Sequence, residues 1–349
     1  MGVNIGKIKR KVNLKDKKHI KKYKQNKQQF DQNPNFEYKC DITSTIYFNG
    51  TKALAAYISP KDEIEYLAVG NEKNNNIDIF NLRTIKLYKS LKYHDCWIYS
   101  ICYYFNPINN KGYLISSDMD KKIIVFDVYN DYNILIKTQL KDGGDIQKCS
   151  IFFNINNKDY IVSISHTYNY SKIFDFNNFK YLKNIFDTNT HITWDICLWT
   201  YENNYYAIEM SSYSIFIINL FDDKIYANLP ISEDSFSGFI YNNNFLCNCT
   251  RQGEILLWDL INKSMIKLIK VSNKCLYNLI QWNKRYVIAA DLYNNAFRIV
   301  DIINGKLITS VGGYHNDYLK GLSSLYHSIF GPCLLTAGNK TVKLWTLKF

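Results

Sequence analysis

Short runs of apolar residues separated by polar turns fill most of the chain, and one run returns at a regular spacing. Its best-preserved copy reads "ILLWDL" at 255–260, where apolar residues lead into a tryptophan and an aspartate. Related runs lie at 77–82, 123–128, 171–176, 215–220, 297–302 and 342–347, and successive copies are 40 to 48 residues apart. Self-similarity at a nearly fixed period indicates a repeat architecture, so seven copies predict one repeat fold over residues 37–349.

Each copy belongs to a longer unit with a constant order of predicted elements. In the second unit, an apolar-rich strand "WIYSICYY", a second strand "GYLISS", a tight turn and "IIVFDV" follow one another, and "NILIKTQL" comes last. Four short strands with turn residues between them are typical of a propeller blade. The sequence therefore predicts an all-β propeller of seven blades.

The spacing and the aromatic-Asp positions of these units resemble the WD40 repeat family. In that family, a histidine, a serine or threonine, a turn aspartate and a tryptophan form a hydrogen-bonded network within a blade. The resemblance assigns to this network His94, Ser116, Asp120 and Phe126 in the second blade, Trp258 and Asp259 in the fifth, and His315, Thr336, Asn339 and Trp345 in the seventh. Only the second blade keeps the turn aspartate, so we expect a complete network there at most, and more reliance on apolar packing between blades.

The seventh unit has no outer strand of its own, because the sequence ends four residues after Trp345. An open sheet edge at the closure of the ring would leave backbone donors and acceptors unpaired. Residues 41–49, "DITSTIYFN", precede the first strand of the first blade. We expect this N-terminal segment to close the ring as the outer strand of the last blade.

The net charge of +12 lies almost entirely in one segment, since residues 1–28 hold eleven Lys and Arg against the single acid Asp16. Residues 1–36 are therefore expected to form a basic, flexible tail in front of a nearly neutral propeller. The candidate phosphate-binding or nuclear-targeting residues are Lys7, Lys9, Arg10, Lys11, Lys17, Lys18, Lys21 and Lys22. Such a cluster favours salt-sensitive contact with nucleic acid, although a solvated tail with no specific role is also consistent with it.

A membrane role is the other alternative for the tail. Gly2 would accept a myristoyl group after removal of Met1, but Gly6 stands where serine or threonine is preferred. One myristoyl chain binds only marginally, and a polybasic segment is the usual second signal. No apolar run approaches the ~20 residues of a membrane-spanning helix.

The sequence contains no pattern that indicates catalysis, a metal site or a cofactor. GxSxG, HExxH, P-loop and dinucleotide-binding motifs are missing, and the nine cysteines show no zinc-type spacing. "IDIFNLR" at 77–83 is a weak likeness of the ending by which some WD40 proteins dock on a ubiquitin-ligase adaptor, and an exposed Arg83 after a strand is the simpler interpretation.

We therefore expect a non-catalytic protein-interaction scaffold, a subunit of a nuclear or ribonucleoprotein assembly. Its partners are expected to be proteins at the propeller loops and rim, with RNA or an anionic membrane at the tail, and no small-molecule substrate. The expected location is intracellular, either nuclear or nucleolar or cytoplasmic. A membrane-peripheral adaptor anchored at Gly2 is the alternative.

Overall fold

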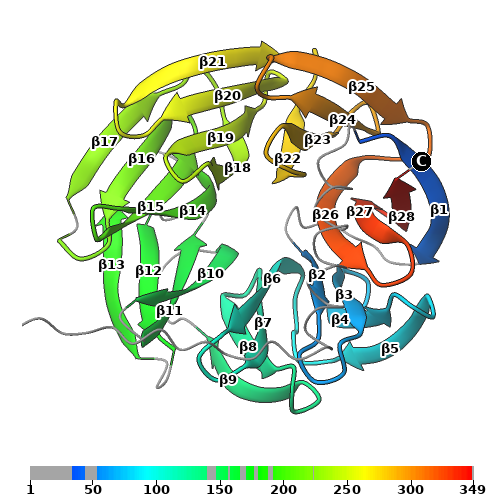
Figure 1. Ribbon diagram of the computed structural model, residues 1–349. Coiled ribbons are helices and arrows are strands. Elements are labelled where there is room, and N and C mark those ends of the chain that lie inside the picture. Colours follow the sequence, from blue (N-terminus) through cyan, green and yellow to red (C-terminus); the bar gives the residue numbers. More distant parts are fainter. Residues whose placement is uncertain are drawn as a thin grey trace, which may run out of the picture.

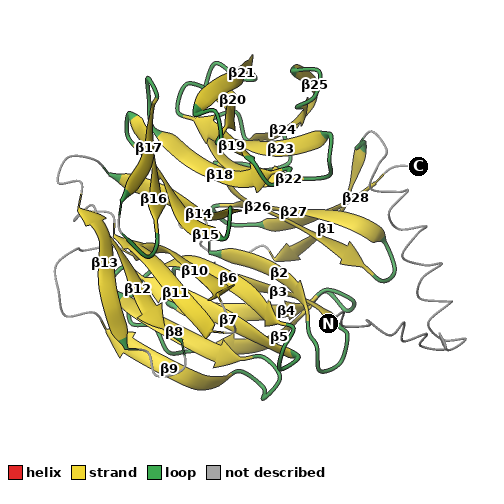
Figure 2. Cartoon of the chain, turned by 60° about the vertical axis from the view of Figure 1, so that its left-hand side comes forward, coloured by secondary structure: helices red, strands yellow, loops and turns green. Residues whose placement is uncertain are grey.

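The computed structural model describes residues 34–43, 53–139, 147–155, 158–165, 170–176, 180–187, 192–222 and 224–347. Within these ranges the chain forms 28 strands in seven four-stranded antiparallel sheets. Figure 1 shows the sheets arranged around a central axis as the blades of a propeller. Figure 2 shows the described chain as strands and loops, and it has no helix that could cross a membrane. The predicted seven-bladed, all-β propeller is confirmed.

The strands of a blade pair in chain order from the axis outwards, except in the last blade (Figure 1). The innermost strands are β2 (Leu54–Ile58), β6 (Ile98–Asn106), β10 (Gln147–Ile155), β14 (Thr193–Tyr201), β18 (Ser235–Tyr241), β22 (Leu276–Gln281) and β26 (Leu319–His327). The second strands are β3 (Glu65–Asn71), β7 (Lys111–Asp118), β11 (Lys158–Ser165), β15 (Asn204–Ser211), β19 (Phe245–Thr250), β23 (Tyr286–Asp291) and β27 (Gly331–Gly338).

The two outer positions complete each sheet. The third strands are β4 (Asn76–Asn81), β8 (Lys122–Asp127), β12 (Tyr170–Asp175), β16 (Ser214–Asn219), β20 (Glu254–Asp259), β24 (Ala296–Asp301) and β28 (Val342–Leu347). The outermost strands are β5 (Lys86–Leu91), β9 (Asn133–Gln139), β13 (Tyr181–Asp187), β17 (Ile225–Pro230), β21 (Ser264–Lys270), β25 (Lys306–Gly312) and, in the seventh blade, β1 (Phe36–Thr43).

Burial follows the position of a strand within its blade. Every residue of β3 and of β8 is buried, whereas β9 is exposed or half-buried along its length. The middle strands are covered by neighbouring blades on both faces, which is why they read as continuous apolar runs instead of alternating. One apolar cluster joins Leu335 of the seventh blade, Leu67 of the first and Leu114 of the second, all fully buried. The core therefore lies between blades.

The N-terminal strand closes the ring, as expected, but it starts earlier than expected. β1 pairs with β28 from Phe36, opposite Leu347, to Thr43, opposite Val342. Phe36 fixes this register, because its ring packs 4.8 Å from Trp282 and 5.8 Å from Phe297 of the sixth blade. The expected segment 41–49 therefore overlaps the real strand only at its first three residues, and the remainder lies outside the described residues, as do residues 1–33.

Candidate functional site

The innermost strands of six blades carry one extra residue close to the point where they begin. In β6, Tyr99 has no partner in β7, although the residues on both sides of it are paired. The extra residues are Tyr99, Lys148, Trp194, Phe236, Tyr277 and Lys320. A β-bulge bends the strand and re-aims the side chain at that position. The alternation of inward and outward residues in a regular strand therefore does not predict which way a bulge residue points.

All these bulges lie at one face of the ring, which we call the His-bearing face because His94 and His315 precede two of them. At this face each innermost strand begins and each second strand ends, since the two are antiparallel. Two kinds of connection therefore lie side by side at this face. They are the loops that join successive blades and the turns between the second and third strands of each blade. These loops sit on rigid sheets, which is where binding sites commonly form.

A pocket of about 380 Å³ opens at the His-bearing face over the fourth to seventh blades. We call it the aromatic pocket, and it is lined by Trp194, Asp234, Phe236, Arg251, Cys275, Tyr277, Leu292, Tyr293, Tyr318 and Lys320. Four of these are bulge residues. The others come from the loops before β18, β22 and β26 and from the turns after β19 and β23. The pocket is therefore assembled from four blades.

The aromatic rings of the pocket pack against one another at steep angles. Phe236 lies 4.7 Å from Trp194 and 5.2 Å from Tyr277, with interplanar angles of 67° and 59°. Tyr293 and Tyr318 form an edge-to-face pair at 5.5 Å and 87° on the rim, where they are 55% and 46% exposed. Edge-to-face packing holds rings in fixed orientations. The apolar walls are thus formed before any ligand arrives.

One ion pair marks the polar side of the pocket. Arg251 donates from Nη1 to Asp234 Oδ2 over 3.3 Å, and its backbone N–H donates to the Asp234 carbonyl over 3.0 Å. The Asp234 side chain is largely covered, whereas that of Arg251 is 66% exposed. Lys320 enters from the seventh blade, and burial lowers the pKa of its ammonium group. The carboxylates of Glu72 and Asp317 act against this shift of the Lys320 pKa. The pocket therefore has an apolar interior and a charged margin, where the Arg251 side chain is the exposed cation.

The thiol of Cys275 and the hydroxyl of Tyr277, inside the pocket, stay neutral near pH 7. Burial raises the pKa of both the Cys275 thiol and the Tyr277 hydroxyl to about 12. A thiol nucleophile needs a lowered pKa, so Cys275 is chemically unreactive where it stands. Within the described ranges, no group of three or more histidine, cysteine or acidic residues is placed to hold a metal ion. The arrangement is suited to binding.

A buried hydrogen-bonded network ties together the strands of the second blade. Nδ1 of His94 lies 2.7 Å from Asp118 Oδ2, and Nε2 lies 2.7 Å from Ser116 Oγ. The aspartate assigned from the sequence was wrong: Asp120 is exposed in the turn, whereas Asp118 is fully buried. Residues 116 and 118 project from the same face of β7, because side chains alternate along a strand. Phe126 is fully buried but offers this network no donor.

The second blade is also where a family model matches the chain. The model for the WD domain, G-beta repeat, matches residues 85–127, which run from β5 through β6, β7 and β8. One sequence repeat thus supplies the outermost strand of one blade and three strands of the next. The chain contains a WD40 repeat and folds as a seven-bladed propeller. No curated protein matches it significantly. WD40 propellers typically serve as non-catalytic platforms for protein interaction.

The seventh blade contains a histidine, a threonine and a tryptophan that are joined by hydrogen bonds. Thr336 Oγ1 lies 2.8 Å from His315 Nε2 and accepts a hydrogen bond from Trp345 Nε1 over 2.8 Å. Burial lowers the pKa of His315 to about 4, so the imidazole is neutral near pH 7. Its Nδ1 pairs with Thr341, so Asn339 does not take the expected place of the turn acid. The backbone N–H of Asn339 donates to Asp317 instead.

The fifth blade uses a substitute network that sequence reasoning missed. Trp258 donates from Nε1 to Asn248 Oδ1 over 3.1 Å, and Asn248 donates to Ser235 Oγ over 2.9 Å. Asp259 lies outside this network and caps the turn after β20 by accepting the backbone N–H groups of Ile261 and Asn262. These hydrogen bonds, above all those from Asn262, lower its pKa. The hydrogen bonds of Trp258 and Asn248 tie β20 and β19 to β18, the strand that carries Phe236 of the pocket.

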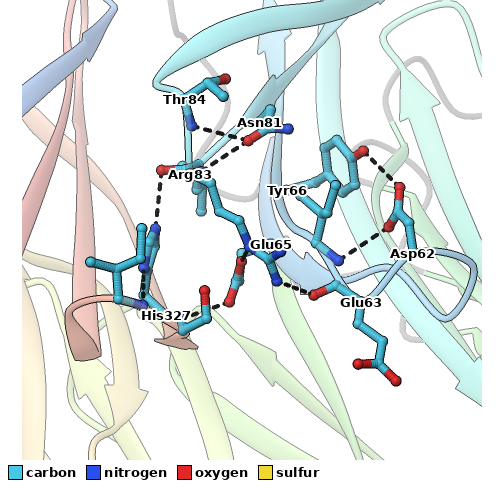
Figure 3. A network of polar contacts seen from close by, with 12 residues as sticks. Asp62, Glu63, Glu65, Tyr66, Asn81, Arg83, Thr84 and His327 are labelled. Carbon is cyan, nitrogen blue, oxygen red and sulfur yellow. Dashed lines mark hydrogen bonds and ion pairs between the residues drawn. The ribbon is translucent and has the colours of Figure 1, made fainter.

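The opposite face of the ring carries a second polar cluster, at the seam between the seventh and first blades (Figure 3). Glu65 accepts hydrogen bonds from Arg83 Nε and from the backbone N–H of Ser328, both over 2.6 Å. His327 donates from Nε2 to the Leu82 carbonyl over 3.0 Å. Arg83 is thus engaged in an internal ion pair instead of standing free after its strand. This cluster binds the two blades to each other.

The pocket residues were not singled out by sequence reasoning, although a signal was present. Large aromatic side chains follow the polar loops at the start of several innermost strands, as in "HITWDI" and "SNKCLYNL". The abundance of tyrosine, 29 residues in the chain, hid this signal. The tail residues and Gly2, which carried the other candidate sites, lie outside the described residues, as does His191.

Proposed function

We propose that the chain is a non-catalytic scaffold that binds proteins at its His-bearing face, as a subunit of a larger nuclear or ribonucleoprotein assembly. The observation that carries this proposal is the aromatic pocket, which joins preformed ring walls to an exposed guanidinium. Aromatic residues and arginine are enriched among the residues that dominate binding energy at protein interfaces. Around the pocket, the loops of several blades offer the wider surface that a protein partner needs.

A binding role fits the chemistry of the pocket better than an enzymatic one. The carboxylate of Asp234 is engaged by Arg251, and the Cys275 thiol is protonated near pH 7. General acid-base catalysis needs a group that exchanges protons near the working pH. The pocket lining contains no histidine, and its one carboxylate, Asp234, is held in the ion pair with Arg251.

The basic tail supplies the second half of the proposal. Eleven lysines and arginines within residues 1–28 neutralise phosphates without regard to sequence, and their affinity falls as the salt concentration rises. The remaining chain is nearly neutral, which leaves protein binding to the ring. We propose that the tail holds RNA or DNA while the His-bearing face holds protein partners.

Affinity capture of the tagged full-length protein from its native cells tests this proposal. Three forms are compared with and without nuclease treatment: the natural chain, the double variant Tyr293→Ala and Tyr318→Ala, and the control Tyr129→Ala. Tyr129 is 44% exposed in the turn after β8, at the face of the ring opposite the pocket. Protein partners that survive nuclease, remain with the control and are lost from the double variant are expected. An unchanged partner set in the double variant would contradict the proposal.

A membrane-peripheral adaptor remains the second candidate, favoured by Gly2 directly ahead of the polybasic segment. Two weak anchors act together in such proteins, because one myristoyl chain alone binds reversibly. Replacing Gly2 with alanine is then expected to release the protein from the membrane fraction of its cells. If the natural chain shows no membrane pool, this candidate fails.

A further inference from the structure

We propose that the aromatic pocket recognises a peptide segment in which a large apolar side chain stands next to a carboxylate. This inference rests on the proposed function, because it names the kind of partner that the His-bearing face binds. The apolar side chain lies between the rings, and the carboxylate meets Arg251 at the rim. Either an internal aspartate or glutamate or the carboxyl terminus of a partner supplies that carboxylate.

The size and lining of the pocket support the apolar half of the ligand. Its volume of about 380 Å³ is at the small end of the ~300–1,000 Å³ that ligand pockets span. One or two side chains fill such a space, whereas a flat protein surface does not enter it. Phe236, Leu292 and Cys275 are each less than one-tenth exposed, so the inner walls are apolar and closed. A large apolar side chain loses its contact with water there.

The donors and acceptors at the rim support the carboxylate. A guanidinium has five N–H donors, and Arg251 directs one side-chain contact to Asp234 among the residues that the structure describes. The carboxylates beside the pocket already receive donors. Asp234 accepts from Arg251, Asp317 accepts from the backbone N–H of Asn339 over 3.1 Å, and Glu233 accepts from the Gln252 amide over 3.0 Å. Arg251 therefore keeps donors at the rim with which to bind a further carboxylate.

Lys320, the second cation of the pocket, also favours a negatively charged ligand. Lys320 lines the pocket from the seventh blade, and burial lowers its pKa because the ammonium loses contact with water. An anion brought close to a desolvated ammonium stabilises its charged form. A cationic peptide side chain would instead approach Arg251, whose side chain is 66% exposed at the rim. Although aromatic faces attract cations, this exposed guanidinium opposes such a ligand here.

Two displayed peptide libraries separate the possible sources of the carboxylate. One library presents random internal segments, and the other presents random free carboxyl termini. Both are selected on the full-length protein and counter-selected on the double variant Tyr293→Ala and Tyr318→Ala. We expect enrichment of Phe, Trp, Leu or Met adjacent to Asp or Glu in the first library, or of a large apolar final residue in the second. Enrichment of Lys or Arg beside the apolar residue would overturn the inference.

Binding of the selected peptides, labelled with a fluorophore and measured by anisotropy, identifies the contacts. Arg251→Gln is expected to weaken binding about tenfold, and amidation or Glu-to-Gln exchange in the peptide by a similar factor. Arg251→Lys is expected to restore part of the loss, and Tyr129→Ala, at the opposite face, to leave binding unchanged. Circular dichroism of each variant establishes that it is folded. Equal affinity of acidic and amide peptides would refute the carboxylate contact.

The two proposals fail in different ways. If protein partners captured from cells depend on Tyr293 and Tyr318 but neither library yields a pocket-dependent peptide of this class, the ligand inference is wrong and the scaffold function stands. If neither the captured proteins nor the peptides depend on the pocket, both are wrong. Pocket-dependent binding of a fluorescent oligouridine in place of peptides would likewise overturn the peptide inference.

Discussion

Glu209 gives the sharpest test of how the blades pack. It lies in β15 of the fourth blade, is fully buried, and accepts a hydrogen bond from Ser171 in β12 of the third blade. Its second carboxylate oxygen has no partner in the described part of the structure. Burial raises its pKa from 4.5 to about 7, since the interior disfavours the charged carboxylate.

This shift makes the stability of the folded chain depend on pH. The folded carboxyl group keeps its proton up to about pH 7, whereas the unfolded group loses it near pH 4.5. The free energy of unfolding therefore falls as the pH rises through this window and levels off above it. A shift of this size corresponds to about 3 kcal/mol in total, of which roughly 2.5 kcal/mol is lost between about pH 5 and about pH 8.

Glu209→Gln removes this titration while keeping an acceptor for Ser171. The amide leaves an unpaired donor, but that cost of about 1–3 kcal/mol is the same at every pH. Urea unfolding followed by tryptophan fluorescence at about pH 5 and about pH 8 gives the two free energies for each form. The natural chain is expected to lose roughly 2.5 kcal/mol more than the variant. Glu202→Gln, an exposed change in the same blade, serves as the control. Parallel pH dependence in the natural chain and Glu209→Gln would refute the reasoning.

Three further predictions test the network, the closure and the pocket. Asp118→Ala is expected to destabilise the fold by about 2 kcal/mol or more, because it leaves buried donors unpaired. Asp120→Ala is expected to change the stability by no more than about 0.5 kcal/mol. Urea unfolding compares the two variants, and equal effects would restore the assignment made from the sequence. Deleting residues 34–43 is expected to abolish cooperative thermal unfolding, because β28 loses its outer partner, whereas deleting residues 1–28 leaves the melting temperature unchanged. Cys275 is expected to resist iodoacetamide in the folded protein at about pH 8 and to react after unfolding, because burial raises its pKa to about 12. Mass spectrometry of the peptide that contains Cys275 measures the labelling, and rapid labelling of the folded protein would contradict its burial.

The sequence by itself determined the number of blades and the closure of the ring. The middle strands of each blade are covered on both faces, so each unit carries a long apolar run, and that run recurs often enough to be counted. The same reasoning predicted an N-terminal closing strand, because an open edge at the last blade would leave backbone groups unpaired. It placed that strand too late, since the anchor of its register is the contact of Phe36 with Trp282, about 250 residues away in the sequence.

Only the tertiary structure decided which side chains meet. Asp118, and not Asp120, lies beside His94 because β7 runs to Asp118, one residue beyond the predicted strand "GYLISS", and Asp120 in the following turn faces solvent. The aromatic pocket gathers residues from Trp194 to Lys320 across four blades, and bulges supply four of them. A bulge is a property of the pairing between two strands, and its direction in space depends on how the blades close around the axis. Neither is recorded in the local pattern of apolar and polar residues, so the pocket appears only when the ring is assembled.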